Sequence, residues 1–269
     1  MLRFSCAGRS HPGLVRGNNE DAGFSGPYLQ VVADGVGGNA AGEVASATAA
    51  YVVSALASAS RGQEPAEVLR RAVELVHEQL RVGTASDPAR TGMGTTLTAL
   101  LIDGERCALA QVGDSRAYLL RDGVLTQITR DHTYVQTLVD AGVISREEAR
   151  VHPRKNVVIN ALEAGTLAVP DVTQVDLAVG DRFLLCSDGL TDLVDDDTLA
   201  HCLGAVDPDD AVATLVQAAL DAGGTDNVTA LVSDVEDAPM LVFYGASLGA
   251  MADPSLVVDP AAVHTTRAG

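Results

Sequence analysis

Short apolar runs that end in an Asp-Gly pair are the most informative pattern in this sequence. Residues 29–33 read Leu-Gln-Val-Val-Ala before Asp34-Gly35, and residues 183–187 read Phe-Leu-Leu-Cys-Ser before Asp188-Gly189. Runs of this length predict buried strands. Each aspartate therefore stands where a strand ends, and the glycine beside it lets a ligand approach the backbone closely. We hypothesise that the two carboxylates share one site.

Hairpin signals dominate the middle of the chain. Asp103-Gly104 and Asp122-Gly123 each stand between apolar runs of strand length, which predicts tight turns between antiparallel strands. An antiparallel meander differs from the alternating βαβ order of a dinucleotide-binding fold, and the spacings GxGxxG and GxxxxGK[ST] are both absent from the sequence. The expected strands cover residues 2–8, 29–33, 97–102, 107–112, 116–120, 124–125, 157–162, 172–177, 182–186 and 228–235.

Helices are expected between these groups of strands. Residues 40–59 are rich in alanine, and residues 64–82 carry apolar side chains near helical spacing. Ser145-Arg146-Glu147-Glu148 resembles a capping box that opens a short helix. Further helices are expected at residues 131–141, 195–203 and 208–222.

The charge balance limits which partners the chain can have. The 269 residues carry 36 Asp and Glu against 18 Lys and Arg, a formal net charge of −18. This field repels nucleic acid and anionic lipid, so neither is an expected partner. A phosphate-bearing substrate could bind only with the help of bound cations or a local arginine. The 47% hydrophobic content is ample for one sizeable core.

Cysteine spacing and hydropathy indicate an intracellular setting. Cys6, Cys107, Cys186 and Cys202 are far apart, without metal-ligand spacing, which favours reduced thiols. The first residues lack the apolar core of a signal peptide, and no apolar run reaches the ~18 residues that a membrane helix needs. The sequence therefore predicts a cytoplasmic protein that does not insert into a membrane, and we expect a monomer.

The composition changes near residue 236. We expect one domain at residues 1–236, followed by a tail at 237–269 that is rich in Ala, Pro, Gly and Ser. The apolar residues 241–244 predict a docked segment within a flexible tail. An extra strand that covers a sheet edge is the alternative.

Five aspartates stand within two residues of Gly, Asn or Ser at turns or strand ends. Taken singly, each is typical of an Asx turn or a cap. Carboxylates that share a buried site need compensating charge, which Mg²⁺ or Mn²⁺ supplies through oxygen ligands. Zinc is disfavoured because no His/Cys ligand set is visible. The five are Asp21, Asp34, Asp114, Asp188 and Asp226.

Six stretches in order resemble the motifs of metal-dependent Ser/Thr protein phosphatases of the PPM (type 2C) family, in its single-domain bacterial form. Together they extend over roughly residues 5–235, which become the expected catalytic domain. The stretches are Val15-Arg16-Gly17-Asn18-Asn19-Glu20-Asp21, Ala33-Asp34-Gly35-Val36-Gly37-Gly38 with Gly42-Glu43, Gly92-Met93-Gly94-Thr95-Thr96, Val112-Gly113-Asp114-Ser115-Arg116, Cys186-Ser187-Asp188-Gly189-Leu190 and Gly224-Thr225-Asp226-Asn227-Val228-Thr229.

The resemblance implies an α+β fold, a four-layer α-β-β-α sandwich of two antiparallel sheets flanked by helices, with a metal cleft at one end of the sheets. It implies that Asp34 bridges two Mn²⁺ or Mg²⁺ ions and that the Gly35 carbonyl binds one of them. Asp188 and Asp226 would bind the other. The remaining roles that it implies are a weaker third ion at Asp114 with Asp188, indirect support of the ions by Glu20, Asp21 and Asn227, and a grip on the substrate phosphate by Arg16.

The activity that the resemblance implies is hydrolysis of phosphoserine and phosphothreonine in proteins, in opposition to a bacterial Ser/Thr kinase. A water activated between two ions would attack phosphorus without a covalent phosphoenzyme. Two alternatives stay open. One is a scaffold of the same fold that binds phosphoproteins without cleaving them, and the other is a phosphatase for a small metabolite.

Some positions depart from the family pattern. Val36 stands where some members carry a histidine as a proposed general acid, so His132 and His152 become candidates for that role. His11 stands where an aspartate is common, and residues 156–165 differ from the usual pattern. Residues 156–165 lie in the flap, residues 142–170, where we expect substrate preference to reside.

Overall fold

Two antiparallel sheets form the centre of the molecule in the computed structural model, which describes residues 1–36, 41–239, 242 and 244–263. The first sheet has the order β1 (Leu2–His11), β12 (Val228–Asp237), β11 (Arg182–Cys186), β7 (Arg116–Arg121) and β8 (Val124–Gln127). The second has the order β10 (Asp171–Gln174), β6 (Arg106–Val112), β5 (Leu97–Asp103), β3 (Leu29–Val36), β2 (Asp21–Ser25) and β13 (Ala246–Gly249). The short strands β4 (Gly94–Thr95) and β9 (Leu162–Glu163) extend it beside the end of β3.

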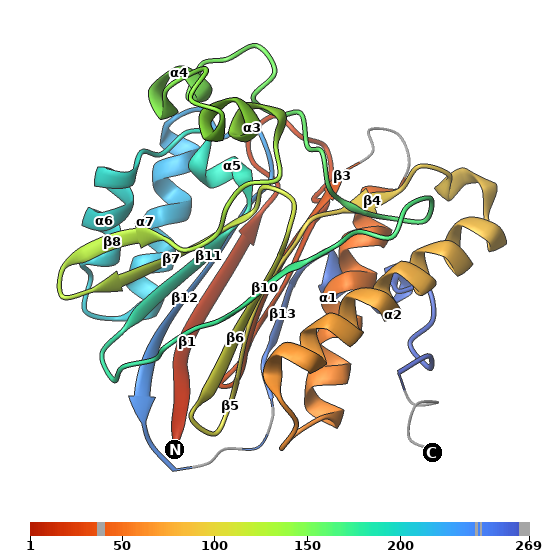
Figure 1. The fold of residues 1–269 in the computed structure, drawn as a ribbon, viewed down its shortest axis with the longest axis horizontal. Coiled ribbons are helices and arrows are strands. Elements are labelled where there is room, and N and C mark those ends of the chain that lie inside the picture. The colour runs from red at the N-terminus through yellow and green to blue at the C-terminus, as the bar shows by residue number, and fades with distance from the viewer. Residues whose placement is uncertain (37–40, 240–241, 243, 264–269) are drawn as a thin grey trace.

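Helices cover the outer face of each sheet (Figure 1). Against the second sheet lie α1 (Gly42–Ala59) and α2 (Pro65–Ser86), and against the first lie α6 (Asp196–Leu203) and α7 (Pro208–Asp221). The predicted α-β-β-α sandwich is therefore confirmed. The other helical pieces are α3 (Tyr134–Asp140), α4 (Arg146–Arg150), α5 (Asp188–Thr191) and the 3-10 turns η1 (Pro88–Arg90), η2 (Ala250–Ala252) and η3 (Pro254–Leu256).

Three hydrophobic layers hold the four structural layers together. Between the sheets lie Phe4, Leu100, Phe183 and Leu231, and the Phe4 and Phe183 rings meet edge to face with centroids 6.2 Å apart. A second layer lies between the second sheet and α1 with α2, and a third lies between the first sheet and α6 with α7. The central strands, such as β5 and β11, are thus buried on two faces, which is why their sequences are mostly apolar.

Two sequence expectations on the flap side of the molecule are wrong. No strand forms over residues 157–162, because Val157 and Ile159 are 44% and 56% exposed and only Leu162 joins a strand. The helix expected at residues 131–141 begins at Tyr134, because the Thr133 side chain caps it by accepting a hydrogen bond from the Gln136 N–H. A run of apolar residues predicts a strand only where a sheet is present to bury it.

The C-terminal region returns to the sheet after residue 245. Strand β13 pairs antiparallel with β2 and covers its edge, and Tyr51 Oη donates a hydrogen bond to the Pro260 carbonyl at 3.0 Å. Of the docked segment expected at residues 241–244, residues 241 and 243 lie outside the described part, and the Val242 and Tyr244 side chains are exposed. The domain boundary at residues 236/237 stays a prediction.

Within the part of the chain that the structure describes, every helix is too short or too polar to cross a bilayer.

Replacing Phe183 by alanine tests the layer between the sheets. The side chain is 0% exposed, so we expect Phe183→Ala to lower the free energy of unfolding by about 3–5 kcal/mol through lost burial and a cavity. Urea denaturation followed by circular dichroism measures the change. Val206→Ala is the control, because Val206 is 98% exposed and should change the value by less than about 0.5 kcal/mol. A loss below about 1 kcal/mol for Phe183→Ala would contradict the assignment.

Candidate metal centre

Aspartates from both sheets meet at one end of the sandwich, near β3 and α5 in Figure 1. Asp21 begins β2 and lies directly across from Asp34 in the register of β2 and β3. Asp188 follows β11 of the other sheet and opens α5. Asp114 occupies the turn between β6 and β7, and Asp226 precedes β12. The strands thus bring together five carboxylates that are up to 205 positions apart in sequence.

Hydrogen bonds from Thr96 fix the backbone at Asp34. The Asp34 N–H donates to Thr96 Oγ1 at 2.9 Å, and the Thr96 N–H donates to the Asp34 carbonyl at 2.8 Å. The Thr96 hydroxyl also bonds the Ser115 hydroxyl at 2.7 Å, next to Asp114. Thr96 therefore links Asp34 to the turn that carries Asp114 through one buried side chain.

Asp21 is the most deeply enclosed of the acidic residues. Its side chain is 0% exposed. The Ser187 hydroxyl donates to its Oδ2 at 2.7 Å, whereas its Oδ1 has no hydrogen-bond partner among the described residues. Burial raises the pKa of this carboxyl to about 7. A buried carboxylate oxygen without a partner is energetically costly. A hydrogen-bond donor or a bound cation at this atom would remove that cost.

The neighbouring aspartates are shifted in the same direction. Burial raises the pKa of Asp114 to about 8 and that of Asp188 to about 6, with further contributions from nearby carboxylates. Burial and the proximity of Asp21, Asp188 and Asp114 raise the pKa of Asp34 well above its ordinary value. These are the shifts expected when like charges are desolvated together.

Close backbone contact joins β3 to the start of α1 beside these carboxylates. A Cβ atom on Gly35 would lie 2.5 Å from the Gly42 carbonyl oxygen, and one on Gly42 would lie 2.7 Å from Glu20 Oε2. Neither position has room for a side chain. The glycines therefore leave the Gly35 backbone and the Glu20 carboxylate side by side at the edge of the site.

Asn227 ties the loop that carries Arg16 to the site. Its Nδ2 donates to the carbonyls of Pro12 and Asn18 at 3.0 and 2.9 Å, and its Oδ1 accepts the Glu20 N–H at 2.8 Å. The side-chain amide is thus occupied by backbone groups. Asn227 supports the loop and does not itself point a free oxygen at an ion.

The Arg16 guanidinium lies on an acidic residue of the predicted site. Its Nη2 is 2.7 Å from Asp226 Oδ2, and the Arg16 side chain is 54% exposed. The hydrogen bond and the charge of Asp226 raise the pKa of Arg16. To bind a phosphate, Arg16 would exchange this carboxylate for the phosphoryl oxygens.

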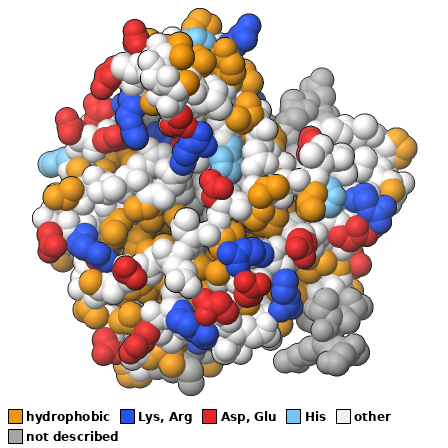
Figure 2. Space-filling view, viewed as in Figure 1, with side chains coloured by type: hydrophobic (Ala, Val, Ile, Leu, Met, Phe, Trp, Pro, Cys, Tyr) orange, Lys and Arg blue, Asp and Glu red, His pale blue; other side chains and the backbone are white. Residues whose placement is uncertain are grey.

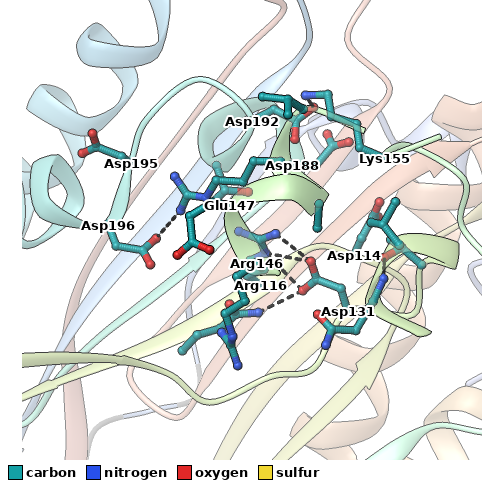
Figure 3. Close-up of a pocket in the computed structure, with 18 of the residues that line it drawn as sticks. Asp114, Arg116, Asp131, Arg146, Glu147, Lys155, Asp188, Asp192, Asp195 and Asp196 are labelled. Carbon is teal, nitrogen blue, oxygen red and sulfur yellow. Dashed lines mark hydrogen bonds and ion pairs between the residues drawn. The ribbon is translucent and has the colours of Figure 1, made fainter. Parts of the chain in front are cut away.

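A cavity of about 590 Å³ opens from the acidic site beneath the flap. Asp114 and Asp188 both line it, and α3, α4 and the residues after α5 form its other walls (Figure 3). Arg116 makes a two-pronged ion pair with Asp131 on one side of it, with the shortest contact 2.7 Å. The cavity is continuous with the predicted ion site and large enough to accept several side chains of a bound segment.

Two ion pairs connect the flap to the helices beside this cavity. Arg150 of α4 lies 3.0 Å from Asp196 of α6, and Lys155 lies 2.7 Å from Asp192. Figure 3 shows Lys155 and Asp192 together at the rim. The position of the flap over the cavity therefore depends on contacts between partly exposed charges.

The carboxylates interact in pairs instead of forming a closed ligand set. Among the described residues, no three His, Cys, Asp or Glu side chains are grouped tightly enough to hold one ion together. Each of the five aspartates nevertheless either has its pKa raised by another carboxylate or raises the pKa of another. A divalent cation would relieve this repulsion and satisfy Asp21 Oδ1, and carboxylate oxygens suit Mn²⁺ or Mg²⁺. The donor chemistry of these residues therefore fits Mn²⁺ or Mg²⁺.

The sequence did not reveal the groups that hold the aspartates in place. Thr96 and Ser187 lie inside motifs, but the sequence does not predict that they form hydrogen bonds with Asp34 and Asp21. Asp131 is 6% exposed and holds Arg116, yet it was expected only as the start of a helix. The candidate general acid His132 has both ring nitrogens engaged. His152 Nδ1 accepts the Arg154 N–H at 3.1 Å within the flap.

The architecture and the buried carboxylates define a metal-binding α-β-β-α sandwich, and comparison with known proteins identifies its family. The family model described as Protein phosphatase 2C matches residues 16–228. The chain belongs to this protein phosphatase 2C family.

Two named relatives show the extent of the likeness. The serine/threonine protein phosphatase PstP of Mycobacterium tuberculosis strain H37Rv is 46% identical over 240 residues, 88% of this chain and 46% of the relative. The serine/threonine phosphatase Stp of Listeria monocytogenes strain EGD-e is 36% identical over 234 residues, 83% of this chain and 93% of the relative. The chain thus spans about half the length of the mycobacterial relative.

Solved structures agree with the fold. The M. tuberculosis serine/threonine phosphatase PstP/Ppp superposes with a TM-score of 0.82 at 45% identity, over 87% of this chain and 100% of that one. The catalytic domain of PstP in complex with two manganese ions gives a TM-score of 0.83 at 44% identity, over 88% of this chain and 100% of that one.

The raised pKa values predict how stability depends on pH. Aspartates that titrate near 3.8 in the unfolded chain hold protons up to about 6, 7 and 8 at Asp188, Asp21 and Asp114 in the folded state. Their contribution to the free energy of unfolding is complete at a pH below the pKa of the unfolded state. It is lost as the pH rises through the pKa values of the folded state. We therefore expect the free energy of unfolding in chelator to fall between about pH 5 and 8, and millimolar Mn²⁺ to reduce that fall.

Urea denaturation at a series of pH values measures this slope. Asp21→Asn removes one of the carboxyls that must ionise and should flatten it. Glu105→Gln, an exposed position in the β5–β6 turn, should keep the slope of the unmodified protein. A free energy of unfolding that rises over this range in chelator would refute the buried acidic cluster.

Proposed function

We propose that this protein is a Mn²⁺- or Mg²⁺-dependent phosphatase that removes phosphate from phosphoserine and phosphothreonine in proteins. The observation that carries the proposal is a buried set of carboxylates beside Arg16, in a chain of the protein phosphatase 2C family. PstP and Stp, its relatives, are named serine/threonine phosphatases. The manganese-bound PstP domain supports manganese as a cofactor here.

In this proposal the aspartates hold the ions. Asp34 and the Gly35 carbonyl would hold one ion, Asp188 and Asp226 would hold the other, and Asp34 would be shared between the two. Glu20 and Asp21 support the ions through waters, and Asn227 fixes the loop around them. Asp114, with Asp188, holds a weaker third ion. Bound divalent cations supply Lewis acidity and lower the pKa of a water that can attack phosphorus.

Arg16 binds the phosphate. A guanidinium offers two parallel N–H donors to a phosphoryl group, a geometry that lysine does not match. Its loop is anchored by Asn227, and the Leu14 N–H donates to the Gly224 carbonyl at 2.7 Å. The phosphate can enter an acidic protein because bound cations reverse the local sign of the field.

We further propose that the partners are phosphorylated proteins and that the protein opposes a Ser/Thr kinase. The names of PstP and Stp support protein substrates. The cavity under the flap supports a substrate larger than a small metabolite, because it extends well beyond the acidic site. A cytoplasmic location and a monomeric state stay predictions.

Hydrolysis of a phosphothreonine peptide tests the function. With millimolar Mn²⁺ we expect phosphate release that chelator abolishes, and Asp34→Asn should be inactive and bind Mn²⁺ more weakly in calorimetry. Glu105→Gln, exposed in the turn at the opposite end of β6 from Asp114, is the matched carboxylate control. Tight peptide binding without release would favour the scaffold, and preference for sugar or nucleotide phosphates would favour the metabolite phosphatase.

Substitution of Arg16 tests its role. A lost charged hydrogen-bonding partner costs about 1.5–3 kcal/mol, so Arg16→Ala should raise KM roughly 10- to 100-fold with a smaller effect on kcat. Arg16→Lys should fall between, because charge remains but the two-pronged geometry is lost. Arg9→Ala is the control, since Arg9 pairs with exposed Asp209 on α7. Steady-state kinetics that show a fall in kcat with unchanged KM would reject the assignment.

A further inference from the structure

We propose that His132 is a positioning residue that couples the flap, residues 142–170, to the turn that carries Asp114. The inference rests on the proposed function, because it assigns Asp114 to an ion site. His132 is 7% exposed and lies between these two parts of the molecule. Its backbone and its ring contact both of them.

On the Asp114 side, His132 clamps Gly113 from two directions. The His132 N–H donates to the Gly113 carbonyl at 2.8 Å, and the Gly113 N–H donates to His132 Nδ1 at 3.2 Å. Gly113 has φ +99°, and a Cβ there would lie 2.5 Å from Thr96 Cγ2. The turn is therefore held between Thr96 and His132, so the place of Asp114 depends on both.

On the flap side, His132 contacts the interior of the flap and the residue that directly follows it. The Ile159 N–H donates to the His132 carbonyl at 2.8 Å, and Asn160 Nδ2 contacts His132 Nδ1 at 3.1 Å. The same Nδ2 donates to the Val169 carbonyl at 3.0 Å. His132 Nε2 lies 3.1 Å from Asp171 Oδ2, at the residue where the chain re-enters the sheet as β10.

These contacts fix the state of the imidazole. Nδ1 faces two N–H donors, Gly113 and Asn160, so it is the acceptor. The proton therefore lies on Nε2, which donates to Asp171. With both nitrogens occupied, the ring acts as a strut between neighbours and not as the proton donor to a leaving group.

The coupling works in both directions. A flap that moves to admit a phosphoprotein segment pulls on Asn160 and Asp171, and through the ring it shifts the Gly113 turn. An ion held at Asp114 conversely steadies the turn and with it the flap, as linkage requires. The element with two arrangements is the flap, which roofs the cavity beside Asp114 and Asp188.

Two substitutions separate the contacts of the ring. His132→Asn places an acceptor where Nδ1 lies but does not reach Asp171. His132→Gln reaches Asp171 with its amide but offers no acceptor near Gly113. His132→Asn thus keeps the contacts of Nδ1 with Gly113 and Asn160, and His132→Gln keeps the contact of Nε2 with Asp171. A residue that merely filled space would show no such division.

Hydrogen exchange and Mn²⁺ calorimetry measure the two sides without turnover. For His132→Gln we expect faster exchange at residues 113–115 and a weakest-site Mn²⁺ affinity lower by about fivefold to tenfold, the factor expected for one lost buried hydrogen bond. For His132→Asn we expect Mn²⁺ affinity within about twofold but faster exchange over residues 142–170. Mn²⁺ should slow flap exchange in the unmodified protein and less so in either variant.

Kinetics add a third readout. His132→Asn should raise KM for a phosphopeptide while KM for p-nitrophenyl phosphate, which does not need the flap, stays unchanged. Asp171→Ala should reproduce His132→Asn, and Asp171→Asn, which keeps an acceptor for Nε2–H, should restore the unmodified behaviour. Asp171 is 58% exposed, so these variants remain informative if a His132 variant does not fold.

The outcomes separate this inference from the proposed function. An inactive unmodified protein that still shows the divided effects on exchange and Mn²⁺ binding would refute the phosphatase and keep the coupling. Equal effects of His132→Asn and His132→Gln on both readouts would overturn the coupling. So would Asp171→Ala leaving flap exchange unchanged.

Discussion

The burial of negative charge at one end of the sheets is the constraint on which the rest of the structure depends. Desolvation and mutual repulsion both oppose ionisation of these aspartates, as their raised pKa values show. The frame that carries them must therefore be stable without help from the site. The three hydrophobic layers supply that stability, and the aspartates stand where the buried strands of those layers end.

The same constraint explains why so many small hydroxyl residues surround the site. Thr96 and Ser187 donate or accept hydrogen bonds that fix Asp34 and Asp21 without adding charge. Arg16 is the exposed counterpart, because it reaches its carboxylate from a surface loop. A site built this way has buried anions inside and an exposed cation at its mouth, which suits the exchange of a carboxylate for a phosphate.

The sequence predicted the parts of the molecule that local patterns determine. Asp-Gly turns located the hairpins, because period and turn chemistry are local properties. The apolar run before Asp188 located the end of β11, whereas β3 continues past Asp34 to Val36. Residues whose role depends on a distant partner could not be predicted. The Arg116–Asp131 pair and the contacts of His132 join segments whose meeting depends on the fold, and β13 pairs with β2 across more than two hundred residues.

The flap differs from the frame in the forces that hold it. Several of its apolar side chains stay in solvent, including Val151 at 82% and Val169 at 75% exposure, and Figure 2 shows hydrophobic atoms at the upper end of the face where the flap lies. Its ties to the helices are partly exposed ion pairs such as Lys155–Asp192, a kind worth about 0–1 kcal/mol. A weakly held roof with apolar side chains can change its contacts without disturbing the buried aspartates. Substrate choice and ion binding can therefore vary separately except where His132 joins them.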